Sequence, residues 1–266
     1  MGKFLFLFLW LLALPAAAES RFITLASTTS TDNSGLFAHI LPRFTEQSDV
    51  SVRVVAVGTG AALRLGARGD VDAVLVHARQ DELAFVAAGH GVARRDVMHN
   101  DFVVIGPPND PARLRGGRDI AAALRKIAAA KARFISRGDD SGTHRAERRH
   151  WNSAGVDPSR GSGEWYLETG AGMGATLNVA AAKSAYALTD RATWLAFGNR
   201  AGLAIMVEGD PRLRNPYGVI MVNPMKHRHV KREPAKKFID WLISPQGKAA
   251  IASFRIDGRQ VFFPAP

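Results

Sequence analysis

The sequence SRGDDSGTH occupies residues 136–144, between an apolar run that ends at Ile135 and a pattern typical of a helix. The first amides of a helix lack intrahelical partners and carry the positive end of the helix dipole. Ser141 and Thr143 add hydroxyl donors, the glycines allow a ligand to approach the backbone, and Arg137 offers a guanidinium suited to oxyanions. The stretch therefore predicts one wall of a pocket that binds a small anion.

Two further strand–loop–helix junctions have a similar character. Residues 22–26 predict a short strand that leads into STTSTDNSG, residues 27–35. One hydroxyl or amide side chain is enough to cap a helix, whereas eight polar residues follow one another here, so we interpret this loop as an anion-contacting loop. Residues 50–57 predict a second strand, which ends at Gly58-Thr59-Gly60. That turn is either another wall of the pocket or a simple tight turn, and it lacks the third glycine of a dinucleotide fingerprint.

The order of the predicted elements indicates an α/β fold. Three β-α pairs precede residue 92, and residues 92–98 and 101–105 predict two extended pieces. The prolines of residues 107–111 break the chain, and the β-α pattern then resumes. We predict two lobes, each a mostly parallel sheet flanked by helices, with the ligand in the cleft between them. Lobe I is assigned residues 19–104 with 218–266, and lobe II residues 105–217.

The composition excludes several classes of site. The 266-residue chain contains no cysteine, so disulfides, thiolate metal sites and a cysteine nucleophile are excluded. Its formal net charge of +11 raises nucleic acid as a partner, but the basic residues are scattered and are not interleaved with aromatic residues. We therefore expect no nucleic-acid partner and interpret the basic surface as one that attracts anions over long range.

The N-terminus predicts export. Lys3 is followed by the apolar run Phe4 to Leu14, then by Pro15 and three alanines. This order is typical of a signal peptide, here residues 1–18 with cleavage near Ala18. No later stretch is long and apolar enough to span a bilayer, so the expected location is the periplasm.

Five motifs together resemble one protein family. They are TTS within Ser27 to Ser30, the intact SRGDDSGTH, GAGMGATL at residues 170–177, TDRAT at 189–193, and EGDPRLRNPYG at 208–218. On these motifs the chain resembles the TupA-type tungstate-binding proteins, the substrate-binding components of tungstate ABC importers, over nearly the whole mature chain. Two positions depart from the family pattern: Ser27 replaces a threonine but keeps its hydroxyl, and Ala192 replaces a usual glycine.

The resemblance implies a type II periplasmic-binding-protein fold and a non-enzymatic protein that binds tungstate, or molybdate, without a cofactor. It implies an ABC permease and an ATPase as partners, and we expect a monomer. Tungsten would be bound as an oxyanion, so no cation site is expected. Residue types and resemblance together assign the ligand-binding residues Thr28, Thr29, Ser30, Thr59, Ser136, Arg137, Ser141, Gly142 and Thr143.

Asp139 separates two ligand classes. An arginine, an acid and hydroxyls in this order also resemble phosphate-binding proteins, in which the acid accepts a proton from hydrogen phosphate. Tungstate carries no proton at neutral pH, so an acid that faced it would repel it. We predict that Asp139 points away and fixes Arg137 or caps the helix; an Asp139 that faces the anion would favour phosphate.

Other interpretations stay open. Arg191 and the glycines Gly172 and Gly174 either contact the ligand or serve packing and ion pairing. Ser141 with His144 could form a serine hydrolase pair, although the G-x-S-x-G elbow is absent. An anion sensor that signals to a membrane partner has the same sequence features as an importer component.

Overall fold

The computed structural model describes residues 21–266, so the predicted signal peptide, residues 1–18, lies outside the described residues. The first part of the chain forms β1 (Arg21–Thr28), α1 (Thr29–Asn33), α2 (Leu36–Ser48), β2 (Val50–Val57), α3 (Thr59–Arg68), β3 (Ala73–Val76), α4 (Arg79–Ala87) and β4 (Gly91–Gly106). The middle part forms α5 (Ile120–Ala129), β5 (Phe134–Ser136), α6 (Gly142–Ser153), β6 (Tyr166–Glu168), α7 (Met173–Lys183), β7 (Tyr186–Asp190), α8 (Arg191–Ala196) and β8 (Ala204–Val207). The last part forms β9 (Arg214–Val222), α9 (Arg232–Ile243), α10 (Pro245–Ser253), β10 (Arg255–Ile256), β11 (Arg259–Gln260) and β12 (Phe263–Pro264); two short 3-10 turns lie at Pro158–Gly161 and Pro211–Leu213.

The strands form a mixed sheet, in the order β2-β1-β3-β9-β4-β7-β5-β6. At its two ends the pairing is parallel, as the sequence predicts: β1 pairs with β2 and β3, and β5 pairs with β6 and β7. In the middle, β4 and β9 run antiparallel to each other, β9 antiparallel to β3, and β4 antiparallel to β7. The α/β fold is therefore confirmed, and the expectation of mostly parallel sheets is corrected in the middle. The physical reason is that β4 carries the chain from the first group of strands to the second and β9 carries it back, so the two strands run in opposite directions.

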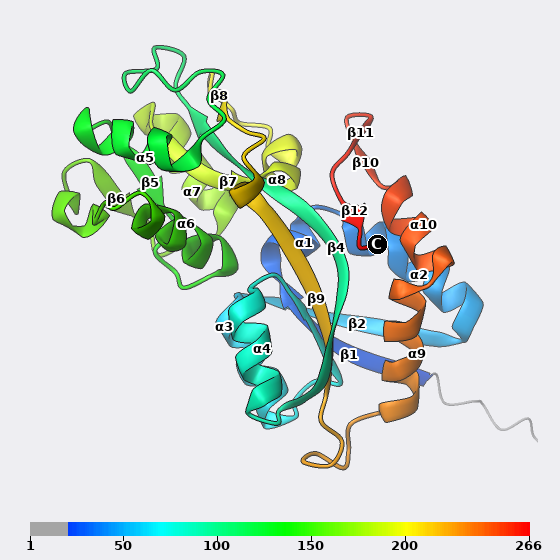
Figure 1. Cartoon of the computed structure of the whole chain (residues 1–266). Helices are drawn as coiled ribbons and strands as arrows, with labels where there is room; N and C mark the ends of the chain where they lie inside the picture. Colours follow the sequence, from blue (N-terminus) through cyan, green and yellow to red (C-terminus); the bar gives the residue numbers. More distant parts are fainter. Residues whose placement is uncertain (1–20) are drawn as a thin grey trace, which may run out of the picture.

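Figure 1 shows two groups of elements joined by the long strands β4 and β9. One group holds β1 to β3 with α2, α3, α4 and α9, and the other holds β5, β6, α5, α6 and α7. Each has its own buried clusters: Phe44 packs on Phe238 in the first, with ring centroids 5.1 Å apart, and Phe134 packs on Trp151 in the second, at 5.3 Å. The predicted lobe boundaries fall inside β4 and β9 and stay a prediction.

Helix α6 is held by its buried face. Trp151 is 1% exposed, and its packing against Phe134 on β5 holds the helix on the sheet. Truncating such a side chain typically costs about 3–5 kcal/mol. At the other end of α6, the Ser141 side chain accepts a hydrogen bond from the amide of His144 and so begins the helix. This packing places the first turn of α6 next to the ends of β1 and β2.

Among the described residues, no helix has both the length and the apolar character that a bilayer crossing requires.

Candidate anion-binding site

The three predicted loops meet at one small pocket. Eight of the nine residues assigned from the sequence line it, and its walls lie so close together that no sphere the size of a water molecule fits between them. The lining residues are Thr28, Thr29, Ser30, Val57, Gly58, Thr59, His77, Arg137, Ser141, Gly142 and Thr143. They come from the carboxyl ends of β1, β2, β3 and β5 and from the starts of α1, α3 and α6. The pocket therefore lies between the two groups of elements that β4 and β9 join.

Ser136 is the predicted residue that does not line the pocket. It is fully buried at the end of β5, and its hydroxyl oxygen accepts a hydrogen bond of 3.3 Å from the amide of Gly138. It therefore shapes the turn that carries Arg137. In the first loop, Ser27 has a similar structural role, because its hydroxyl donates to the carbonyl of Leu75 at 2.7 Å.

The hydroxyls of the first loop hold one another. The Thr28 oxygen lies 2.6 Å from the Thr31 hydroxyl and 3.1 Å from the Ser30 hydroxyl, and it accepts a bond of 3.3 Å from the Thr31 amide. Thr28 thus caps α1 and lines the pocket at once. Capping and anion contact, which the sequence leaves as alternatives for this loop, are compatible in the structure.

Four polar atoms that border the pocket are buried without a hydrogen-bond partner among residues 21–266. They are Thr59 Oγ1, Thr143 Oγ1, Arg137 Nε and His77 Nε2. Such atoms number six in the described chain, so most of them gather at this one place. A buried polar group without a partner costs about 1–3 kcal/mol, and native structures keep few of them. A ligand with several acceptor oxygens would satisfy the hydroxyls and the guanidinium together.

Arg137 carries the positive charge of the pocket wall. Its side chain is 5% exposed, and Nη2 donates to Asp139 Oδ2 at 2.5 Å. The other Asp139 oxygen accepts from the amide of Ser141 at 3.2 Å. Of the two roles predicted for Asp139, the structure shows that it fixes Arg137; the helix cap is Ser141, whose amide Asp139 holds. Asp139 is not among the residues that line the small pocket.

Position 142 requires a glycine because His77 and Thr59 pack closely against its backbone. A Cβ at this position would lie 2.6 Å from Cε1 of His77 and 2.8 Å from Oγ1 of Thr59. Both distances are too short for real side-chain contacts, so a larger residue would push His77 or Thr59 away. The first amide of α6 can therefore border the same space as the imidazole and the hydroxyl.

His77 is the pocket residue that sequence reasoning missed, together with Val57; Gly58 belongs to the turn that the sequence offers as a possible wall. The Nδ1 of His77 lies 3.1 Å from Asn215 Oδ1 on β9. Burial lowers the pKa of His77 to about 4, and the nearby guanidiniums of Arg137 and Arg149 act in the same direction. The available signal was its position: it directly follows a predicted strand, as the other pocket residues do.

Three residues left open by the sequence are now placed. Arg191 pairs with Asp101 at 2.6 Å and with Glu208 at 2.8 Å, and these partners raise its pKa. It does not line the small pocket, so the structure supports its ion-pairing role. Gly172 borders an adjoining hollow, whereas Gly174 borders neither space.

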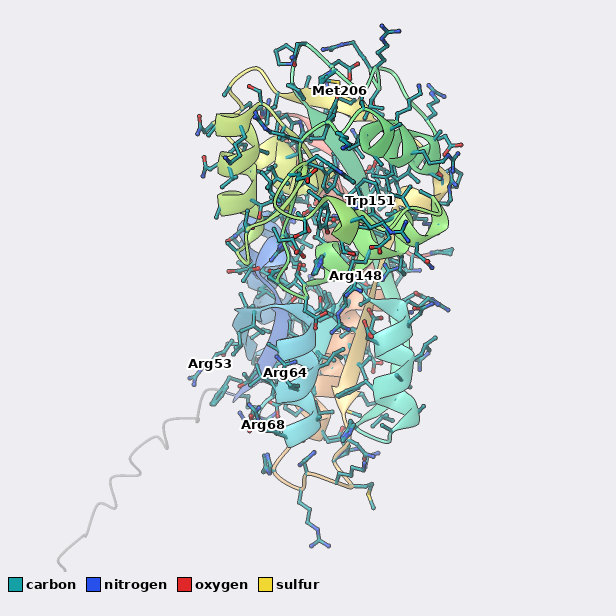
Figure 2. All side chains as sticks on the ribbon, turned by 90° about the vertical axis from the view of Figure 1, so that its left-hand side faces the viewer. Arg53, Arg64, Arg68, Arg148, Trp151 and Met206 are labelled. Carbon is teal, nitrogen blue, oxygen red and sulfur yellow. The ribbon has the colours of Figure 1, made fainter. Side chains whose placement is uncertain are left out.

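This adjoining hollow forms the mouth of the pocket. It has a volume of about 290 Å³ and is lined by Thr29, Gly58, Gly60, Ala61, Arg64, Arg137, Asp139, Asp140 and Gly172. Figure 2 shows Arg64 on α3 and Arg148 on α6 on the same face of the molecule, on either side of the junction between the two groups. Basic side chains near such a mouth raise the local concentration of anions.

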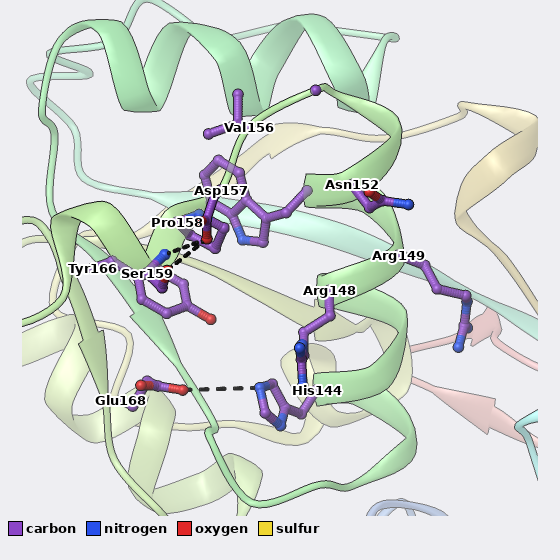
Figure 3. Close-up of a pocket in the computed structure, with 12 residues that line it drawn as sticks. His144, Arg148, Arg149, Asn152, Val156, Asp157, Pro158, Ser159, Tyr166 and Glu168 are labelled. Atoms are coloured by element: carbon purple, nitrogen blue, oxygen red, sulfur yellow. Dashed lines mark hydrogen bonds and ion pairs between the residues drawn. The ribbon is translucent and has the colours of Figure 1, made fainter.

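A larger and more open hollow of about 830 Å³ lies along the other side of α6 (Figure 3). It contains His144, whose Nε2 is 4.0 Å from Oε1 of Glu168, and whose Nδ1 accepts from the amide of Asp140 at 3.0 Å. Ser141 Oγ faces the His144 amide and not its ring. Ser141 and His144 therefore do not form the hydrogen bond that links a serine nucleophile to its histidine base.

Comparisons with known proteins agree with this geometry. Residues 15–246 match the model of the PBP superfamily domain. The chain is 46% identical over 234 residues to the tungstate-binding protein TupA of Peptoclostridium acidaminophilum, covering 87% of this chain and 81% of that protein. It is 38% identical over 237 residues to TupA of Campylobacter jejuni, covering 88% of this chain and 87% of that protein.

Solved structures show the same relation. The tungstate-binding protein TupA of Desulfovibrio alaskensis superposes with a TM-score of 0.81 at 45% identity, covering 92% of this chain and 99% of that one. The tungstate ABC transporter structure from Geobacter sulfurreducens has a TM-score of 0.80 at 50% identity, with 88% and 98% covered. These relatives are named for binding and transport, which confirms the expectation of a protein that is not an enzyme. The chain belongs to the PBP superfamily and, within it, to the family of the TupA tungstate-binding proteins.

Proposed function

We propose that this protein captures tungstate in the pocket between β1, β2 and β5 and delivers it to an ABC permease and its ATPase. The observation that carries the proposal is the cluster of unpartnered buried atoms on Thr59, Thr143 and Arg137. A tetrahedral dianion offers four acceptor oxygens and needs donors on every side. In a chain of the TupA family, that ligand is tungstate.

The pairing of Asp139 favours a fully deprotonated oxyanion. Hydrogen phosphate carries a proton and is best held by an acceptor in the pocket. Here the carboxylate is held by Arg137 and the Ser141 amide, outside the lining of the small pocket. Molybdate is the second candidate ligand, because its size and charge are nearly those of tungstate.

The remaining parts of the proposal concern the whole molecule. We assign residues 1–18 to a signal peptide cleaved near Ala18 and the mature protein to the periplasm, where it acts as a monomer. Residues 19–104 with 218–266 and residues 105–217 form two lobes that close on the anion. Their buried clusters, which are separate except near the boundaries in β4 and β9 and at Ala192, support this division. Closure excludes water and strengthens each hydrogen bond to the charge.

Isothermal titration calorimetry of residues 19–266 tests the proposal. Tungstate, molybdate, sulfate and phosphate are titrated into the protein in turn, after prolonged dialysis. We expect the tightest binding for tungstate at a stoichiometry of one. Tight binding of phosphate without binding of tungstate would refute the proposal, and tungstate uptake by cells that lack the protein would separate import from sensing.

A further inference from the structure

His77 ends a chain of buried amides that crosses between the two long strands. Its Nδ1 lies 3.1 Å from Asn215 Oδ1, and the amide nitrogen of Asn215 donates to Asn100 Oδ1 at 2.7 Å. The amide nitrogen of Asn100 lies 3.3 Å from the Tyr217 hydroxyl and 3.5 Å from Asp190 Oδ1. Asn100 on β4 and Asn215 on β9 are cross-strand neighbours.

The direction of this chain determines which ring nitrogen carries hydrogen. Because the nitrogen of Asn215 donates to Asn100, its oxygen faces the imidazole, and His77 Nδ1 must be the donor. In the neutral ring, Nε2 then presents a lone pair. Nε2 is buried, has no partner among the described residues, and belongs to a side chain that lines the pocket. A lone pair in that position repels the oxygens of an anion.

The charge balance points the same way. Arg137 is the cation of the pocket lining, and Asp139 already pairs with it at 2.5 Å. Arg145 on α6 is likewise engaged by Asp81 and Asp140, each at 2.6 Å. Arg64 lines the mouth and forms no ion pair among the described residues, but it does not line the small pocket. A dianion in the small pocket would therefore meet little uncompensated positive charge from the side chains of the lining itself.

We propose that His77 takes up one proton from solvent when a dianion binds, so that Nε2–H donates to an anion oxygen and the ring supplies a second positive charge. The inference rests on the proposed function and adds a proton linkage to it. No bond of the protein breaks; the imidazole becomes an imidazolium with both nitrogens donating, one to Asn215 and one to the anion.

The groups around His77 explain why the ring stays neutral until the ligand binds. Burial lowers the pKa of His77 to about 4, Asn215 acts in the raising direction, and Arg137 and Arg149 act in the lowering direction. The rings of Tyr217 and Phe102 pack on it at 4.8 Å and 6.5 Å and bring no charge. A bound dianion places two negative charges next to Nε2 and so raises the pKa of His77.

One competing arrangement exists. If both asparagine amides rotated, the neutral ring could donate from Nε2 while Nδ1 accepted from Asn215. Asn100 Oδ1 would then face Asp190 across the 3.5 Å contact that its amide nitrogen now makes, and two oxygens would be opposed. That arrangement binds the anion without taking up a proton, which makes the two outcomes measurably different.

The experiment is calorimetric titration of tungstate at pH 7.5 in buffers of different ionisation enthalpy. We expect about one proton taken up per tungstate, and affinity that falls roughly tenfold per pH unit between the pKa of His77 in the free protein, about 4, and its pKa in the complex. The variant His77→Gln should bind more weakly and lose both the proton uptake and the pH dependence. The control is His150→Gln on α6, a histidine of equally lowered pKa, about 4, that does not line the pocket; it should keep both.

Nuclear magnetic resonance of ¹⁵N-histidine-labelled unmodified protein covers the case in which a variant fails to fold. In the tungstate complex at pH 7.5, both ring nitrogens of His77 should show the shifts of an imidazolium. Tight tungstate binding without proton uptake, or a singly protonated His77 ring in the complex, would overturn this inference and leave the proposed function standing. Absence of tungstate binding would overturn both.

Discussion

The unpartnered hydroxyls of Thr59 and Thr143 should strengthen tungstate binding and lower the stability of the ligand-free protein. Both side chains are buried, at 0% and 1% exposure, and neither hydroxyl has a partner among the described residues. Replacing each by valine keeps the shape and removes the desolvated hydroxyl. A hydrogen bond to a charged group contributes about 1.5–3 kcal/mol, so each variant should bind tungstate about 10- to 150-fold more weakly.

The same variants should not lose stability. An unsatisfied buried hydroxyl costs about 1–3 kcal/mol, so the ligand-free variants should unfold at the same temperature or a few degrees higher. The matched control is Thr45→Val, whose hydroxyl donates to the carbonyl of Val50 at 3.2 Å. It should lower the unfolding temperature slightly and leave the affinity unchanged. Calorimetric titration and thermal unfolding without ligand measure both quantities. If Thr59→Val and Thr143→Val were destabilised and bound tungstate normally, the reasoning would be wrong.

Three further predictions concern charge, space and pH. Arg137→Ala should weaken tungstate binding at least 100-fold because it removes the guanidinium of the pocket lining and leaves the Asp139 carboxylate without its partner, whereas removal of the exposed Arg68 by alanine should change the titration little. Gly142→Ala should abolish tight binding in the same titration while far-ultraviolet circular dichroism stays that of the folded protein, since its Cβ would lie 2.6 Å from His77. Burial raises the pKa of Glu147 to about 7, so the stability it contributes is complete below about pH 4.5 and is lost as pH rises through about 7, in total about 3 kcal/mol. Urea unfolding of Glu147→Gln at pH 5 and pH 8 should show that this part of the pH dependence has gone; an unchanged dependence would assign it to another group.

Local pattern was sufficient for most of the pocket wall. Hydroxyls, glycines and an arginine follow three predicted strands, and parallel strands bring such ends to one edge of a sheet. The 136–144 loop also positions its own arginine, because Asp139 holds Arg137 only two residues away. Contacts of this short range can be inferred from order and spacing alone.

The long strand β4 shows where local pattern fails. Residues 92–98 and 101–105 predict two pieces, because the polar residues His99 and Asn100 lie between them and Asp101 begins the second. In the structure, Asn100 bonds to Asn215 and Asp101 pairs with Arg191, so one strand continues through both. Partners about 90 or more residues away in the chain satisfy these two polar side chains, and the neighbouring sequence does not predict such partners.

The sequence by itself determined the α/β class, the two hydroxyl-rich loops at 27–35 and 136–144 and the family that the chain resembles, because each depends on residues close together in the chain; it left open whether the 58–60 turn joins the pocket and whether Asp139 fixes Arg137 or caps a helix. Only the tertiary structure decided that β4 and β9 run antiparallel through the middle of the sheet, that Ser136 turns away from the pocket, and that His77 enters it. Those features depend on contacts such as the one between His77 and Asn215, which are 138 residues apart. Burial and hydrogen-bond direction, which exist only after folding, give that histidine its place in the site.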